Sequence, residues 1–243
     1  MSLGVIGGLG PMATAYFMQL VINMTKAETD QEHLEMIIYN CPTIPDRTAY
    51  ILGLSQDSPL PKIIELGKRL KEQEVSCIAI PCITAHYFHQ EIEEATGLPV
   101  IHGIRETALL LKEKNVQRVG IMATDGTIQS RIFQNELEML GLEAIVPKED
   151  MQQKVMSLIY DDVKKGKEPD MNSFFEIKDY LIKEEGAQAI VLGCTELSVI
   201  KRDYELGDGI CDAMEVLVKR AISLCGKEVH PKYRELFVPL KGQ

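Results

Sequence analysis

The amino-acid sequence predicts an α/β protein made of two similar lobes, each with a doubly wound parallel sheet. Short apolar runs of strand length alternate along the chain with longer segments of helical period. The short runs are continuous in Val, Ile and Leu, which is typical of parallel strands covered on both faces by helices. A coarse repeat of strand, polar turn and helix in the two halves indicates two lobes.

The first half of the chain is expected to alternate strands and helices from its first residues onward. Proline in the first turn indicates where the first two helices begin, and Gly97 followed by Pro99 indicates where the third one ends. Strands are expected at 3–7, 36–39, 77–81 and 100–101, and helices at 11–24, 59–71 and 84–96.

The second half is expected to repeat this alternation. Ile128, Phe133, Leu137 and Leu140 lie near one face of a single helix that Gly141 would end. Strands are expected at 119–122, 144–146 and 189–192, and helices at 106–114, 127–140, 155–165, 171–185 and 214–224.

Composition excludes several classes of protein. With 26 Lys and Arg against 36 Asp and Glu, the net charge of -10 argues against a nucleic-acid partner and against an anionic membrane surface. The N-terminus lacks the pattern of a signal peptide and no run of 18 apolar residues occurs, so a cytoplasmic location is expected. Six cysteines in 243 residues are too few for a disulfide scaffold, and all six are expected to be thiols.

Two cysteines occur in matched contexts. Cys82 follows the apolar run IAIP and precedes Ile83 and Thr84, whereas Cys194 follows AIVLG and precedes Thr195 and Glu196. Each cysteine is therefore expected at the carboxyl end of a buried strand and the start of a helix, where open parallel sheets bind ligands. If the lobes face each other, the two thiols flank one interlobe active site.

A thiol at such a turn has a specific chemical use. The helix N-terminus stabilises thiolate, so the pKa is expected below its free value, and the free N–H groups can bind a carboxylate. One thiol on each side of a substrate carbon is what a two-base racemase requires. The alternative is that free cysteines simply pack in the core, which is the interpretation we adopt for the remaining four, Cys41, Cys77, Cys211 and Cys225.

Five motifs in order along the chain resemble the aspartate/glutamate racemase family, with the aspartate racemase branch most similar. They are GGLGPMAT (7–14), IPDRT (44–48), PCITAH (81–86), GIMATDGT (120–127) and GCTEL (193–197). The resemblance implies two α/β lobes with an active site between them, racemisation without pyridoxal phosphate or another cofactor, and a homodimer. It also implies that the closing helix returns to the first lobe, which gives lobes of 1–100 plus 208–243 and of 101–207.

The resemblance also implies roles for individual residues. Cys82 and Cys194 would be the acid/base thiols, and Arg47 and Lys164 would bind the side-chain carboxylate of the substrate. The other implied substrate-binding positions lie in the same motifs and are Gly8, Met12, Ile83, Thr84, Thr124, Thr127, Thr195 and Glu196. The bottom-up alternatives are a surface arginine in a Pro-rich loop, a solvated lysine, and threonines and a glutamate that cap helices.

Other ligands are less well supported. GLGPMA resembles a dinucleotide-binding turn, but Pro11 lacks one N–H and Asn40 stands where an acidic residue would hold the ribose. Cys82, His86 and His89 lack a second pair at zinc spacing, so no metal is expected. The roles of His86 and His102 stay open.

One residue departs from the family pattern. The family usually has Asn where this chain has Ile83, and isoleucine cannot hydrogen-bond a substrate. The resemblance implies a racemase of aspartate, with glutamate or a broader set of amino acids also considered. Two alternatives remain: an isomerase or decarboxylase of small dicarboxylates with the same fold, and an amino-acid-binding protein with weakened catalysis.

Overall fold

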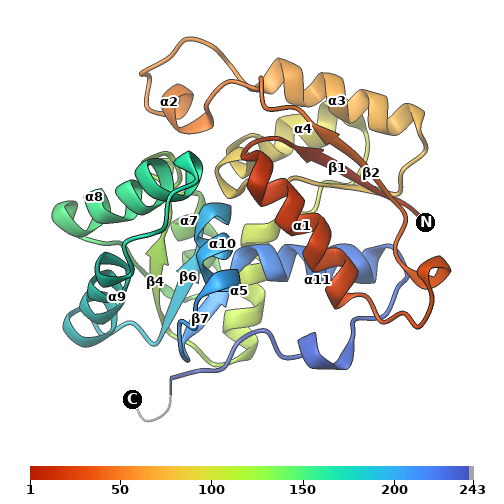
Figure 1. Cartoon of the computed structure of the whole chain (residues 1–243). Coiled ribbons are helices and arrows are strands. Elements are labelled where there is room, and N and C mark those ends of the chain that lie inside the picture. Colours follow the sequence, from red (N-terminus) through yellow and green to blue (C-terminus); the bar gives the residue numbers. More distant parts are fainter. Residues whose placement is uncertain (241–243) are drawn as a thin grey trace. The chain divides into compact units, whose positions relative to one another are not determined.

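The computed structural model describes residues 1–240, which form two compact units (Figure 1). The first unit comprises Met1–Gly103 and Met214–Leu236, and the second comprises Ile104–Ala213 and the segment from Phe237 onward. Each unit contains one parallel sheet, so the predicted α/β class with two parallel-sheet lobes is confirmed. Within residues 1–240, no helix combines the length and the hydropathy of a membrane span.

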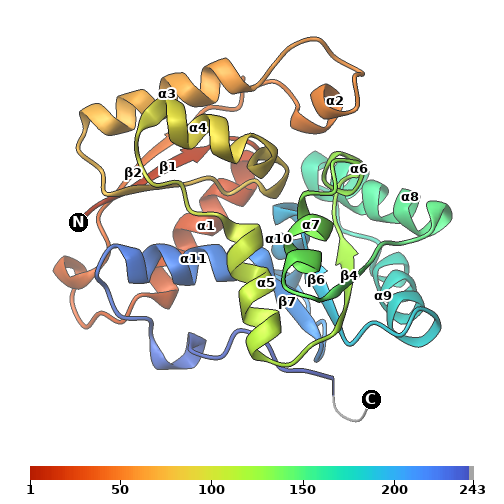
Figure 2. The ribbon, with the colours of Figure 1, turned by 180° about the vertical axis from the view of Figure 1, so that it is seen from behind.

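The first unit is built on a three-stranded parallel sheet in the order β2-β1-β3. The strands are β1 (Leu3–Gly7), β2 (Met36–Asn40) and β3 (Cys77–Ala79). β1 is buried along its whole length because it lies between the other two. Figures 1 and 2 show α3 (Leu60–Glu72) and α4 (His89–Thr96) on one face of this sheet, with α1 (Pro11–Met24) and α11 (Ala213–Leu224) on the other.

The second unit is built on a four-stranded parallel sheet in the order β5-β4-β6-β7. Its strands are β4 (Arg118–Met122), β5 (Glu143–Ile145), β6 (Ala189–Leu192) and β7 (Ile210–Asp212). Its helices are α5 (Gly103–Glu113), α6 (Asp125–Gln129), α7 (Ile132–Met139), α8 (Glu149–Ser157), α9 (Met171–Asp179) and α10 (Thr195–Asp203), and α6 is labelled in Figure 2.

Several predicted elements have different bounds or a different form. The predicted helix 127–140 is two helices, because Arg131 adopts a left-handed conformation with φ 58° that interrupts the regular ladder. The predicted helix 84–96 begins as a 3₁₀ helix at Ile83–Phe88. The predicted helices 155–165 and 171–185 contain π-helical turns at Leu158–Asp162 and Tyr180–Glu184. The expected strand 100–101 is reduced to an isolated bridge between Val100 and Ile78.

The lobe boundary also differs from the predicted one. The prediction placed 208–243 in the first lobe, but β7 pairs with β6 through Ile190 and Ile210 in the second unit. The Gly209 N–H donates to the Val238 carbonyl at 2.9 Å, so the segment from Phe237 also belongs to the second unit. The closing helix α11 packs in the first unit from Met214 onward, and seven of its twelve residues are buried.

Candidate active-site residues

Cys82 lies at the turn that follows β3. It is the N-cap residue of the 3₁₀ helix Ile83–Phe88, and 6% of its surface is exposed. Its carbonyl accepts a hydrogen bond from the Ala85 N–H at 3.1 Å. Ile83 and Thr84 on the same turn are buried as well. The structure therefore has the predicted strand, cysteine and helix in that order.

Two histidines follow Cys82 on this segment, and both interact with backbone groups. His86 Nδ1 lies 3.1 Å from the Cys82 carbonyl oxygen, and the Gly103 N–H donates to His86 Nε2 at 3.1 Å. His89 Nε2 lies 2.8 Å from the Val100 carbonyl oxygen. Burial, with His102 nearby, lowers the pKa of His86 to about 3. Among residues 1–240, no group of three or more His, Cys, Asp or Glu side chains is arranged to hold a metal ion.

Arg47 is buried, not a surface arginine. It is the first residue of the short helix α2 (Arg47–Ile51), whose N-cap Asp46 accepts from the Ala49 N–H at 2.7 Å. Its guanidinium donates to the Leu9 carbonyl at 2.7 Å and to the Pro45 carbonyl at 3.1 Å. The bond to Leu9 places a buried positive charge beside the Gly-rich turn after β1.

The Gly-rich turn has a structural reason for its glycine at position 8. Gly8 has φ 92°, and a Cβ atom there would lie 2.4 Å from the backbone of Cys41. The Gly8 N–H donates to Thr14 Oγ1 at 2.8 Å, which joins the turn to α1. Met12, also predicted to bind substrate, is 58% exposed on α1.

In the second unit, Cys194, Glu196 and Lys164 form a chain of polar contacts. Cys194 is the N-cap residue of α10 and is 5% exposed. Its Sγ donates to Glu196 Oε2 at 2.9 Å, and Lys164 Nζ lies 3.4 Å from Glu196 Oε1. Thr195 Oγ1 lies 3.5 Å from the same Glu196 Oε2. Lys164 Nζ also lies 4.8 Å from the centre of the Tyr160 ring, a cation–π contact that the sequence analysis did not foresee.

The surroundings of Cys194 raise the pKa of its thiol well above the usual value. Burial is the main cause and the negative charge of Glu196 the next, while Lys164 partly offsets both. The prediction that a helix N-terminus would lower this pKa is wrong for Cys194. The helix dipole acts on a thiol that has lost its hydration and faces a carboxylate, and these two effects are larger.

Thr124 and Thr127 form a pair at the start of α6. The Thr124 side chain caps the helix by accepting from the Thr127 N–H at 3.3 Å, and the two hydroxyl oxygens lie 3.1 Å apart. Both residues are buried. The capping interpretation therefore holds for Thr124. By contrast, Cys82 and Cys194 occupy the N-cap positions of the helices that contain Thr84 and Thr195.

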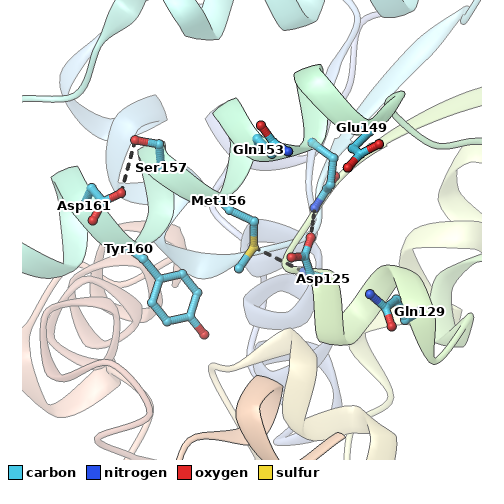
Figure 3. A pocket seen from close by; sticks show the side chains of 9 residues that line it. Asp125, Gln129, Glu149, Gln153, Met156, Ser157, Tyr160 and Asp161 are labelled. Atoms are coloured by element: carbon cyan, nitrogen blue, oxygen red, sulfur yellow. Dashed lines mark hydrogen bonds between the residues drawn. The ribbon is translucent and has the colours of Figure 1, made fainter. Parts of the chain in front are cut away.

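A pocket of about 440 Å³ lies in the second unit beside this pair (Figure 3). Asp125, the residue after Thr124, lies at its centre, where its backbone N–H donates to Met156 Sδ and its carboxylate accepts from Gln152. The lining is mainly carboxylates and amides and comprises Asp125, Gln129, Glu149, Gln152, Gln153, Met156, Ser157, Tyr160 and Asp161. None of the predicted site residues lines it, and the sequence offered no signal for it apart from Asp125 within the ATDGT motif.

Comparisons with known proteins all point to the same family. Residues 6–221 match the family described as Asp/Glu/Hydantoin racemase. The chain is 30% identical over 230 residues to the broad-specificity amino-acid racemase RacX of Bacillus subtilis, covering 91% of this chain and 96% of that protein.

Solved structures agree with this match. The Picrophilus torridus aspartate racemase has a TM-score of 0.82 and 30% identity, with 96% of this chain and 98% of that chain covered. A putative Asp/Glu racemase from Yersinia pestis has the same fold, with a TM-score of 0.77 at 22% identity over 93% of this chain and 99% of that one. The chain therefore belongs to the Asp/Glu/hydantoin racemase family.

Proposed function

We propose that this protein is an amino-acid racemase that interconverts L- and D-aspartate, with Cys82 and Cys194 as its two acid/base groups. The observation that carries the proposal is the matched pair of buried cysteines. Each is the N-cap of a helix that follows a parallel strand, one in each unit. The similarity to an aspartate racemase and to a broad-specificity amino-acid racemase supports the reaction class.

In this mechanism one thiolate takes the Cα proton and the opposite thiol returns a proton to the other side of the carbon. A Cα–H bond breaks as one S–H bond forms, and an S–H bond breaks as the new Cα–H bond forms, so no oxidant or cofactor is needed. The raised pKa of Cys194 favours the protonated form of this thiol. It then serves as the proton donor, and Cys82 serves as the base for the first enantiomer.

The reverse direction begins from the form of the enzyme that the first direction leaves, with Cys194 as the thiolate and Cys82 as the thiol. Glu196 is placed to orient the Cys194 proton whenever this thiol is protonated. The carboxylate already accepts a hydrogen bond from Cys194 Sγ at 2.9 Å. Lys164, 3.4 Å away, stabilises the carboxylate while Glu196 is charged. In this mechanism Glu196 acts on the thiol, in addition to the substrate-binding role that the family resemblance implies for it.

The cations available to a second carboxylate support aspartate as the substrate. Arg47 is a buried guanidinium beside the Gly-rich turn, and Lys164 is a partly buried ammonium. Backbone N–H groups at the starts of the helices after the two cysteines would hold the α-carboxylate and stabilise the carbanion-like transition state. Ile83 removes one side-chain donor from this set, which makes a broader substrate range the second candidate.

The experiment is incubation in deuterated water with L-aspartate, L-glutamate and a panel of other amino acids. NMR should show deuterium at Cα of aspartate together with appearance of the D-form. Cys82→Ala and Cys194→Ala should each lower racemisation by about 10²-fold or more, since each removes a general acid/base group. If no amino acid exchanges its Cα proton, the protein is not a racemase of amino acids.

The same samples distinguish the alternatives. A dicarboxylate isomerase or decarboxylase would convert maleate-like dianions, and NMR would detect the new product without Cα exchange in amino acids. A binding protein with weakened catalysis would show a rise in melting temperature with aspartate but no exchange. The predicted homodimer is a separate matter, and light scattering should give twice the mass of one chain.

A further inference from the structure

We propose that His86 is a positioning residue that fixes the direction of the Cys82 thiol through the Cys82 backbone. The inference rests on the proposed function, in which Cys82 is an acid/base group. The His86 side chain lies within hydrogen-bond distance of the Cys82 backbone. It contacts the Cys82 carbonyl oxygen, so it acts on the peptide that orients the side chain.

The hydrogen bonds of His86 determine which ring nitrogen carries the proton. The Gly103 N–H can only donate, so His86 Nε2 must present a lone pair to it across 3.1 Å. The proton of the neutral ring is therefore on Nδ1, where it is donated to the Cys82 carbonyl at 3.1 Å. The imidazole connects two backbone groups that are 21 residues apart in the sequence, and this tautomer satisfies both.

The surroundings of His86 keep its imidazole neutral. His86 is 6% exposed, and burial together with His102 and His89 disfavours the imidazolium. The rings of His86 and His102 have centroids 5.7 Å apart, and those of His89 and His102 lie 4.4 Å apart. A protonated ring would lose the hydrogen bond from the Gly103 N–H, because Nε2 would no longer have a lone pair to accept it. The neutral form of His86 keeps both hydrogen bonds.

Gly103, which donates to the other nitrogen of the His86 ring, is also a residue that this contact requires. Gly103 is the first residue of α5, so its N–H is one of the helix's initial donors without an intrahelical acceptor. A Cβ atom at Gly103 would lie 3.3 Å from His86 Nε2 and 3.5 Å from Leu217. Glycine therefore lets the backbone approach the ring, and any larger residue would push on it. Through His86 the Cys82 turn is connected to the backbone of Gly103, which belongs to the same unit.

Two substitutions separate the two bonds of the ring. His86→Asn places an amide near the position of Nδ1 and can keep the donor to the Cys82 carbonyl. His86→Gln places its amide near Nε2 and can keep the acceptor for Gly103. If the bond to Cys82 is the one that matters, kcat should fall about 10- to 100-fold in His86→Gln and less in His86→Asn, while KM changes little. His89→Gln is the matched control, since His89 belongs to the same cluster and bonds to Val100 instead.

The decisive readout is the isotope effect of Cα-deuterated aspartate, measured separately from the L- and D-enantiomers. The equilibrium constant of a racemisation is one, so kcat/KM must fall equally in both directions and cannot identify the affected thiol. A misplaced Cys82 slows only its own proton transfer. The isotope effect should therefore rise for the enantiomer that Cys82 deprotonates and fall for the other. A general loss of folded enzyme would change neither.

A second measurement keeps the test independent of turnover. The rate at which iodoacetamide alkylates Cys82, followed by mass spectrometry of its peptide, should change in His86→Gln and not in His89→Gln. Unchanged isotope effects together with an unchanged Cys82 alkylation rate in His86→Gln would overturn the inference. The proposed function fails on a different result, namely racemisation that survives Cys82→Ala. If His86→Gln does not fold, Gly103→Ala tests the same contact from its other end.

Discussion

At residue scale, the surroundings of Cys194 show how burial and one carboxylate outweigh a helix N-terminus. Cys194 donates to Glu196, and Glu196 in turn pairs with Lys164. The thiol is consequently a proton donor at rest, and its readiness to become a thiolate depends on two neighbouring charges of opposite sign. Each charge can be removed separately, so the electrostatic account can be tested in both directions.

Glu196→Gln should lower the pKa of Cys194 toward its ordinary value, because a negative charge and a hydrogen-bond acceptor of the thiol are replaced by a neutral amide. A lower pKa means more thiolate at a given pH, so iodoacetamide should alkylate Cys194 faster at pH 8 than in the unmodified chain. Lys164→Met should have the opposite effect. If both variants shift the rate in the same direction, the charges do not act as described.

Ile83→Asn is expected to raise turnover of aspartate and to lower stability. The amide restores a donor beside Cys82, and a hydrogen bond to a charged group contributes about 1.5–3 kcal/mol. Ile83 is only 1% exposed, so in the absence of substrate the same amide is buried at a cost of about 1–3 kcal/mol. Steady-state kinetics and a thermal melt, each with Ile83→Val as control, measure the two effects separately. Turnover that stays the same or falls would contradict this interpretation.

At the scale of elements, the turn between β1 and α1 depends on Gly8. Its positive φ and its contact with the Cys41 backbone leave no space for a side chain. The Leu9 carbonyl in this turn also accepts a hydrogen bond from the guanidinium of Arg47. A shift of this turn would therefore move a proposed substrate-binding cation as well as the end of the central strand.

Gly8→Ala should reduce the free energy of unfolding by more than Gly53→Ala. Both glycines have positive φ, which costs an L-residue about 1–2 kcal/mol, but a Cβ at Gly53 would have no atom within 4 Å. Gly8→Ala adds a clash with backbone and should cost about 2 kcal/mol beyond the Gly53 value. Urea unfolding of the two variants measures the difference. Equal losses would show that the turn relaxes without strain.

The elements also show what the sequence can and cannot predict. β1, α1 and β6 have the predicted bounds, because a continuous apolar run or a proline-initiated helix is a local signal. The break at Arg131 and the short strand β7 had no such signal, since a positive φ at arginine and a three-residue strand depend on tertiary contacts. The π-helical turns are also tertiary features, because they lie on a helical pattern that the sequence continues.

Some features of the candidate site could be predicted from the sequence, and others could not. The two cysteine turns were predictable because each motif is contiguous in sequence. The contacts of Arg47 with Leu9 and of Lys164 with Glu196 join residues far apart in the chain, and no local pattern contains them. The raised pKa of Cys194 follows from burial, which the local sequence does not specify.

At the scale of the whole molecule, the first unit is discontinuous in sequence. It is completed by Met214–Leu236, after the chain has passed through the second unit. α11 contributes one buried face to it, which includes Met214, Leu217, Val218 and Ile222, each 0% exposed. The interior of the first unit thus depends on a helix that lies more than 100 residues from the end of its other segment.

Deleting 214–243 should therefore unfold the first unit. Hydrogen exchange followed by mass spectrometry should show fast exchange in peptides of β1 and β3, whereas the same buried strands should be protected in the full chain. A control deletion of 241–243 should leave these peptides protected. If β1 and β3 stay protected without α11, the sheet is stable on its remaining helices, and the importance assigned to α11 is wrong.

The same discontinuity has a consequence during synthesis. When β1, β2 and β3 have left the ribosome, α11, one of the two helices on one face of their sheet, has not yet been translated. The part of the sheet that α11 covers in the folded protein stays exposed while more than 100 further residues are added. During this period chaperone binding or aggregation competes with folding. The second unit has nearly all of its sequence in one continuous stretch and can become compact first. The order of folding is then the reverse of the order of translation, and the turn bearing Cys82 would be among the last parts of the protein to become fixed.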